Sequence, residues 1–109
     1  MAASDEQSYD LEPKRVAEMV GAGDAQLVDV RQPHEWEVGA VAQSLRIELD
    51  QLTSRAAEID KDRPVIFICR VGNRSGLATD AFRASGYDAY NARGGVEAWA
   101  EAGLPLESA

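Results

Sequence analysis

The sequence RPVIFIC at residues 63–69 decides the fold, because it is the clearest strand of the chain. Its apolar residues are uninterrupted and mostly β-branched, and the run is too short for a helix. Strands that are buried on both faces of a parallel sheet have this composition. We therefore expect residues 63–69 to lie inside a parallel sheet.

The segments on either side of this strand alternate between strand and helix. Such an order implies an α/β domain, a parallel sheet with helices on both faces. In such sheets ligands bind beyond the carboxyl ends of the strands, and Cys69 lies at that end of the clearest strand. The sequence predicts strands at 25–30 and 87–92, allows a short strand within 41–49, and predicts helices at 12–23, 32–39, 50–62, 75–86 and 94–103.

Apolar spacing within the predicted helices indicates which side faces the core. Ser75 is expected to cap the helix at 75–86, and Gly86 to end it. The inward-facing sets are Val16, Met19 and Val20; Leu52, Ala56 and Ile59; Leu77, Ala78, Ala81 and Phe82; and Val96, Trp99 and Ala100.

Length and charge exclude several classes of protein. A chain of 109 residues is typical of one domain with a single core. The net charge of −8, from 11 basic and 19 acidic residues, disfavours nucleic acid and anionic membranes as partners. We expect residues 1–8 to be a flexible terminus, 9–106 the domain and 107–109 a tail.

The cysteine and histidine counts limit the chemistry further. One cysteine excludes an internal disulfide, and one cysteine with one histidine makes a zinc site within the chain implausible. No metal and no cofactor are therefore predicted. The N-terminus lacks a secretory pattern, and no run approaches the ~18 apolar residues of a membrane helix, so we expect a cytoplasmic protein.

The loop CRVGNRS at residues 69–75 concentrates unusual features. No acidic residue occurs between Arg63 and Thr79, although the chain is acidic. A short loop between a strand and a helix has to curl, and Gly72 permits the positive φ that a curl needs. Backbone N–H groups then turn inward as an anion-binding nest, which would stabilise a thiolate at Cys69.

Two interpretations of Cys69 compete. A lone cysteine after an apolar strand is commonly a small core hydrophobe. A core residue gives no reason for the two arginines, the glycine and the helix start that follow it. Lowering a thiol pKa from ~8.5 to ~6 takes roughly 3.4 kcal/mol, which two or three amide hydrogen bonds can supply. We therefore favour a reactive Cys69.

Three segments resemble the single-domain rhodanese family of thiosulfate sulfurtransferases. They are LVDVRQPHEWEVG at 27–39, VIFICRVGNRSG at 65–76 and ARGGVEAWAEAGLPL at 92–106, and the resemblance covers about 9–106. It implies a rhodanese-like three-layer α/β domain with a five-stranded parallel sheet. It also implies that Cys69 attacks the outer sulfur of thiosulfate, carries a persulfide and passes its sulfur to cyanide or a thiol by ping-pong kinetics.

The resemblance assigns roles to the residues that follow the cysteine. Arg70 and Arg74 would hold the sulfonate of the donor, and Arg70 favours thiosulfate over mercaptopyruvate, whose users carry glycine there. Four residues separate Cys69 from Arg74, whereas related phosphatases have five, so a phosphatase is disfavoured. The amides that would cradle the sulfur belong to Arg70, Val71, Gly72, Asn73, Arg74 and Ser75.

The segment GAVAQSLRI at 39–47 departs from the family pattern. Ala40, Ala42 and Gln43 stand where the family usually has His, Pro and Gly. That segment is mainly structural in rhodaneses, so we expect a weakened local turn and intact chemistry.

Several other residues have plain structural interpretations. The resemblance implies that Asp29 and Arg31, at a strand end, pin neighbouring loops. His34 is expected to lie on an exposed turn without a general-base role. Trp36 and Trp99 are expected to be packing anchors. Gly94 and Gly95 are expected to allow close approach of the backbone.

Two functions from different classes remain open. The first is an enzyme with a small-molecule sulfur donor, thiosulfate, and a thiol or cyanide acceptor. The second is a persulfide carrier or interaction module that exchanges sulfur with a partner protein.

Overall fold

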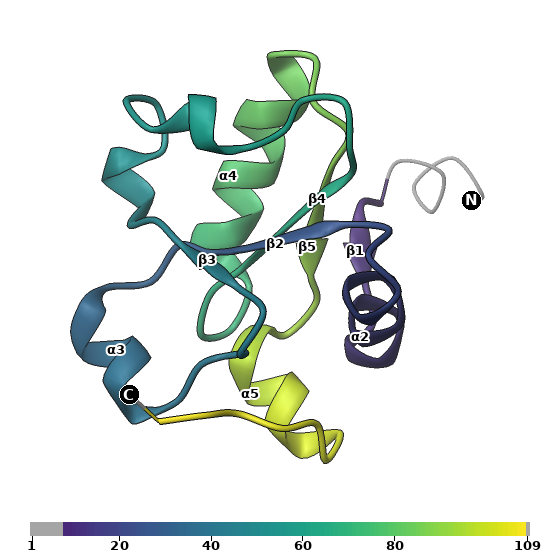
Figure 1. Cartoon of the computed structure of the whole chain (residues 1–109), viewed down its shortest axis with the longest axis vertical. Coiled ribbons are helices and arrows are strands. Elements are labelled where there is room, and N and C mark those ends of the chain that lie inside the picture. Colours follow the sequence, from purple (N-terminus) through teal and green to yellow (C-terminus); the bar gives the residue numbers. More distant parts are fainter. Residues whose placement is uncertain (1–7, 109) are drawn as a thin grey trace.

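The computed structural model describes residues 8–108 and shows a five-stranded sheet flanked by helices (Figure 1). The strand order is β1-β5-β4-β2-β3, and all four neighbouring pairs are parallel. The strands are β1 (Asp10–Leu11), β2 (Gln26–Asp29), β3 (Leu45–Arg46), β4 (Val65–Ile68) and β5 (Ala89–Ala92). The helices are α2 (Pro13–Gly21), α3 (Pro33–Val38), α4 (Asn73–Ala84) and α5 (Gly95–Glu101), with 3-10 turns η1 (Leu49–Gln51) and η2 (Ala56–Glu58).

The helices form layers on both faces of the sheet. Alternate residues of β4 point to opposite faces, so Phe67 joins the core under α4, and Ile66 joins the core under α2 and α5. All four residues of β4 are buried between two parallel neighbours, which confirms the expectation for the centre of 63–69. The strand is shorter than predicted, and Arg63 before it is exposed. The predicted α/β fold with a five-stranded parallel sheet is thus confirmed.

The helix predicted at 50–62 is wrong, because the segment forms the two 3-10 turns η1 and η2. The hydroxyl of Ser54 bonds to the carbonyl of Gln51 at 3.0 Å and competes with helical pairing. Ile59 then takes an extended backbone conformation. Leu52 and Ile59 are nevertheless buried, as predicted, because the turns lie against the core under α4.

Helix α4 begins earlier and faces the core differently than predicted. Gly72, with φ of 106°, takes the N-cap position in place of Ser75, which lies in the first turn. Leu77 is 65% exposed and Ala81 is exposed, so their predicted burial is wrong. Ser75 turns its own side toward the sheet by bonding to Cys69 and Asn91, and the buried face is Ser75, Ala78, Thr79 and Phe82.

The remaining differences lie at the ends of the domain. The edge strand β1 was not predicted, because two residues carry no periodic pattern; it pairs with β5. Ala100 on α5 is exposed, against its predicted burial, because the short helix buries only one side, with Val96 and Trp99. The flexible terminus predicted at residues 1–8 lies outside the described residues except for its last residue, Ser8.

The divergent segment at 39–47 keeps a turn. Ser44 bonds to the carbonyl of Val41 through its amide at 3.1 Å and its hydroxyl at 2.7 Å. Ala40 exchanges backbone hydrogen bonds of 2.9 and 2.8 Å with Glu107, in the predicted tail. Within residues 8–108, none of the helices has the length and apolar character needed to cross a membrane.

Candidate active site

Cys69 directly follows β4, at the carboxyl end of the sheet, and a tight loop leads from it to α4. The carbonyl of Cys69 accepts a 2.8 Å hydrogen bond from the amide of Val96, and that of Arg70 a 3.1 Å bond from Glu97. A Cβ on Gly95 would lie 2.3 Å from the Cys69 oxygen. The start of α5 therefore supports the loop, and the predicted close approach at Gly95 is confirmed.

The sulfur of Cys69 lies in a bowl of hydrogen-bond donors. The amides of Gly72 and Ser75 donate to Sγ at 3.2 and 3.3 Å. The hydroxyl oxygen of Ser75 lies 3.2 Å from Sγ. Cys69 is also only 1% exposed and packs with the core under α4. It is therefore buried as a core residue would be, yet its sulfur is surrounded by polar donors.

The pKa of the Cys69 thiol reflects two opposed effects. Burial raises the pKa, while the Ser75 hydroxyl and the amides of Ser75, Gly72 and Val71 lower it. The hydrogen bonds outweigh the burial, and the pKa lies below the ordinary value of a thiol. A thiolate at Cys69 is therefore stabilised in the direction that the sequence predicted.

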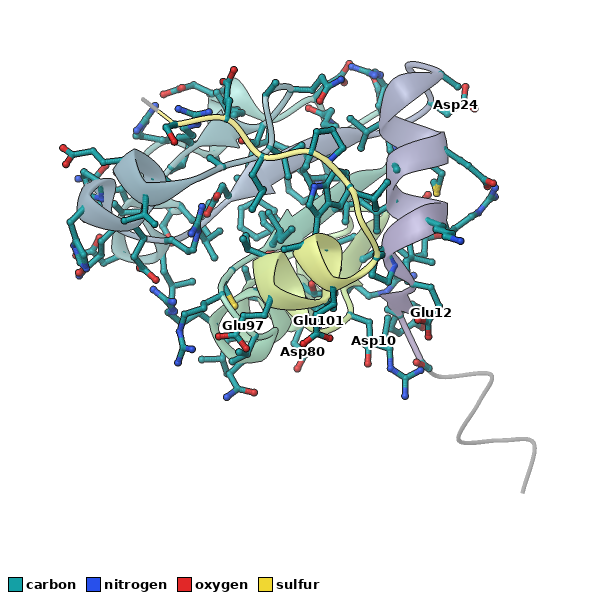
Figure 2. The ribbon with its side chains drawn as sticks, turned by 90° about the horizontal axis from the view of Figure 1, so that it is seen from below. Asp10, Glu12, Asp24, Asp80, Glu97 and Glu101 are labelled. Atoms are coloured by element: carbon teal, nitrogen blue, oxygen red, sulfur yellow. The ribbon has the colours of Figure 1, made fainter. Side chains whose placement is uncertain are left out.

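The two arginines of the loop are engaged in ion pairs. Arg74 makes a bidentate pair with Glu35 of α3, at 2.7 and 2.9 Å. Arg70 binds Glu97 at 2.6 Å, and Figure 2 shows Glu97 on α5. Each guanidinium is thus bound to a glutamate from another element. Sulfonate binding by Arg70 and Arg74 stays a prediction.

The structure brings together only some of the predicted site residues. Cys69, Gly72 and Ser75 meet at the sulfur, and Val71 contributes its amide. The side chain of Val71 is exposed, so only its backbone amide belongs to the bowl. Asn73 is exposed as well, and among the described hydrogen bonds none joins it to the sulfur.

Asp29 and Arg31 form a buried pair that holds α3 in place. Arg31 donates to both carboxylate oxygens of Asp29, at 2.8 to 3.1 Å, and to the carbonyl of Gly39 at 2.8 Å. The predicted scaffold role is confirmed. His34 is exposed on α3, as expected.

Three neighbours of the candidate site were missed by the sequence analysis. Glu35 and Glu97 bind the loop arginines, and Asn91 of β5 accepts a 2.6 Å hydrogen bond from Ser75. A signal for Asn91 was present, because it is a polar residue in a strand that is otherwise apolar toward its end. No local pattern marks the two glutamates.

The Glu35–Arg74 pair makes a testable contribution to stability. Hydrogen bonding to Arg74, opposed by burial, lowers the pKa of Glu35 from 4.5 to about 2. Because the folded pKa is depressed, the stabilisation is complete above pH 4.5 and is lost as the pH falls toward 2. We expect Glu35→Gln to cost roughly 1–2 kcal/mol at pH 7, with solvent screening at the partly exposed Arg74 allowed for.

Chemical denaturation of both proteins at several pH values measures this difference. The gap in unfolding free energy should shrink steadily between pH 4.5 and pH 2. Asp62→Asn, on the exposed loop before β4, is a matched charge removal and should leave stability nearly unchanged. A gap for Glu35→Gln that is the same at pH 3 and pH 7 would contradict the ion-pair account.

Comparison with known proteins agrees with this geometry. Residues 12–102 match the rhodanese-like domain family. A sulfurtransferase of Allochromatium vinosum is 40% identical over 84 residues, which cover 76% of this chain and 78% of that protein. Thiosulfate sulfurtransferase GlpE of Pseudomonas aeruginosa is 33% identical over 90 residues, covering 82% of this chain and 81% of that protein.

The fold has solved counterparts as well. The crystal structure of a rhodanese-related protein from Thermoplasma volcanium superimposes with a TM-score of 0.83 at 26% identity, over 90% of this chain and 96% of that one. The resemblance expected from the three sequence segments is thereby confirmed. The chain belongs to the rhodanese-like sulfurtransferase family.

Proposed function

We propose that this protein transfers sulfane sulfur from thiosulfate to a thiol or cyanide through a persulfide on Cys69. The observation that carries the proposal is the bowl of donors, in which Gly72 and Ser75 bond to Sγ at the end of β4. Such donors stabilise a thiolate, which is the nucleophile this chemistry needs. The 33% identity to GlpE, which is named a thiosulfate sulfurtransferase, supports the choice of donor.

The exchange takes two displacement steps. The Cys69 thiolate attacks the outer sulfur of thiosulfate, a new S–S bond forms, and the old S–S bond breaks as sulfite leaves with its electron pair. The persulfide then carries its negative charge on the outer sulfur. Cyanide or a thiolate attacks that sulfur, and the Cys69 thiolate is the leaving group. No oxidant is needed, because the sulfane sulfur keeps its oxidation state.

The proposal includes the setting in which the protein acts. We expect neither nucleic acid nor a membrane as partner, since the net charge of −8 would repel both. We also propose a cytoplasmic location, because the reducing conditions there keep the thiol of a single cysteine in its reduced, reactive form.

Intact mass spectrometry after incubation with thiosulfate tests the proposal. We expect the protein to gain one sulfur atom, mapped to the peptide that contains Cys69, and to lose it again on addition of cyanide. Sulfite and thiocyanate should appear in equal amounts over repeated turnovers. Absence of the adduct with thiosulfate at millimolar concentration would contradict the enzyme proposal.

One observation favours a second function, that of a persulfide carrier supplied by a partner protein. Both loop arginines are already neutralised by glutamates, and the surface charge repels a dianion such as thiosulfate. A hollow of about 250 Å³ beside Arg74 is also lined by Glu48 and Asp50. A cysteine persulfide on a protein needs no sulfonate site.

The same mass measurement separates the two functions. A protein bearing a cysteine persulfide is offered in place of thiosulfate, and each adduct is timed. Faster loading from thiosulfate supports the enzyme, whereas loading from the protein donor alone supports the carrier.

A further inference from the structure

A chain of polar groups, buried at Ser75 and Asn91, connects Cys69 to the exposed Asp10 of the edge strand β1. Sγ lies 3.2 Å from the Ser75 hydroxyl oxygen, and that hydroxyl donates to Oδ1 of Asn91 at 2.6 Å. Nδ2 of Asn91 then donates to Oδ1 of Asp10 at 3.0 Å. Ser75 is 0% and Asn91 8% exposed, so water has little access to replace these partners.

The orientation of the Asn91 amide follows from its partners. Its nitrogen faces two acceptors, the Asp10 carboxylate and the carbonyl of Gly72 at 3.3 Å. Only an NH₂ group can satisfy both, so the amide oxygen has to face Ser75. The backbone amide of Asn91 also bonds to the carbonyl of Tyr9 at 2.8 Å. Asn91 therefore presents a fixed, buried hydrogen-bond acceptor to Ser75.

The Ser75 hydroxyl has one hydrogen and, when Cys69 is ionised, two acceptors. With a neutral thiol, the S–H can donate to the Ser75 oxygen while Ser75 donates to Asn91, and every group is satisfied. With a thiolate, the hydrogen has to serve either the sulfur or the amide oxygen. If the hydroxyl turns to the sulfur, the amide oxygen of Asn91 loses its buried hydrogen bond, which is unfavourable. If the hydroxyl stays on Asn91, the thiolate keeps only the amides of Gly72 and Ser75 as donors.

We propose that Asn91 is a positioning residue that competes with the ionised sulfur of Cys69 for the Ser75 hydroxyl hydrogen. By this competition Asn91 limits how far the hydroxyl stabilises the thiolate. The Ser75 hydroxyl donates its hydrogen bond to Asn91 when the sulfur is uncharged, and to the sulfur when Cys69 is ionised. In a persulfide the negative charge sits on the outer sulfur, so the inner sulfur releases the hydrogen to Asn91. Taking up sulfur thus restores a buried hydrogen bond.

This inference deepens the proposed function, and only its persulfide part rests on that function. The effect on the free thiol is independent of any donor. A less stabilised thiolate is also a stronger nucleophile, because nucleophilicity rises with thiol basicity. The amides around the sulfur stabilise the thiolate and so reduce its nucleophilicity. The Asn91–Ser75 hydrogen bond would limit this loss, because it withholds one further donor from the sulfur.

Charged groups also lie on the elements around Cys69. They are Arg74 of α4 with Glu35 of α3, Asp29 at the end of β2 with Arg31, Arg70 of the loop with Glu97 of α5, and Asp10 of β1 behind Asn91. All of them are present in the variants at Asn91 and Ser75, so their charges are the same in that comparison; Asp10 is changed separately below.

The test is the pH dependence of Cys69 alkylation by iodoacetamide in four proteins: the parent, Asn91→Ala, Ser75→Ala and the double variant. Freeing the hydroxyl in Asn91→Ala should lower the midpoint by about one pH unit, a tenfold rise in thiolate fraction at low pH. The rate at the high-pH plateau should fall about threefold, following the loss of basicity. Ser75→Ala should raise the midpoint, and the double variant should match Ser75→Ala.

The double variant makes the outcome decisive. If Asn91 merely holds Ser75 in place to donate to the sulfur, Asn91→Ala and Ser75→Ala shift the midpoint in the same direction. That result, an unchanged midpoint, or an Asn91→Ala shift that persists without the Ser75 hydroxyl would overturn the proposal. Sulfur transfer does not enter the measurement, so failure of the proposed function would not disturb it.

Two further variants guard against a folding defect. Asn91→Leu keeps the approximate shape and removes the acceptor, and should shift the midpoint as Asn91→Ala does. Asp10→Ala alters an exposed residue and removes one of the two acceptors that orient the Asn91 amide. Asp80→Ala is a matched removal of one negative charge (Figure 2). Asp10→Ala should lower the midpoint more than Asp80→Ala, and that excess should vanish when Ser75 is also alanine. An excess that survives would overturn the proposal.

Discussion

Replacing Cys69 with serine is expected to abolish both the sulfur adduct and turnover with thiosulfate, a loss of roughly a thousandfold or more. A serine hydroxyl stays protonated at neutral pH, so the amides of Gly72 and Ser75 have no thiolate to stabilise. The measurement is intact mass after incubation with thiosulfate, together with the rate of thiocyanate formation.

The serine variant should remain folded, which separates chemistry from stability. Serine is close to cysteine in shape, and its oxygen can accept hydrogen bonds from the same two amides. A midpoint of thermal unfolding within a few degrees of the parent is therefore expected. Retention of a sulfur adduct by the folded variant would show that sulfur binds elsewhere, and the persulfide proposal would fail.

Replacing Gly95 with alanine is expected to cost roughly 3–5 kcal/mol of unfolding free energy and to disturb the cysteine loop. The added Cβ would lie 2.3 Å from the carbonyl oxygen of Cys69 and 2.5 Å from the carbonyl carbon of Arg70. These are backbone atoms, which cannot move out of the way by a change of side-chain rotamer. The φ of +63° at Gly95 adds strain for any side chain.

Gly103→Ala is the matched control for Gly95. Gly103 has a φ of +79°, but no atom beyond its neighbours in the chain would lie within 4 Å of its Cβ. It should therefore lose only the roughly 1–2 kcal/mol of a left-handed alanine. Chemical denaturation gives both values, and the alkylation rate of Cys69 reports the loop. Equal losses for the two variants would show that contact between α5 and the loop is not tight.

Local patterns were sufficient for most of the fold. The apolar run of β4, the proline and glycine limits of α2 and α3, and the spacing of Val96 and Trp99 on α5 depend only on neighbours in the chain. The same is true of the loop after Cys69, because Gly72 and the helix start lie within a few residues of the thiol. These features could be predicted because the chemistry that causes them is short-range.

Two of the failures depend on contacts with other elements. The segment 50–62 has enough helix-forming residues to suggest a helix, but burial of Leu52 and Ile59 against α4 selects two turns. Helix α4 turns Ser75 inward and leaves Leu77 exposed, because Cys69, just after β4, and Asn91 of β5 contact the Ser75 hydroxyl. Hydrophobic spacing alone predicts the opposite orientation.

The sequence by itself determined most of the strands and helices, although not the edge strand β1 or the turns at η1 and η2. It also placed a single thiol in a curled loop that has no acidic residue. Only the tertiary structure decided what surrounds that loop. Arg74 and Glu35 are 39 residues apart, and Asp10 and Asn91 are 81 residues apart. Whether such groups meet depends on how the parallel strands are ordered in space, and a local sequence pattern contains no information about that distance.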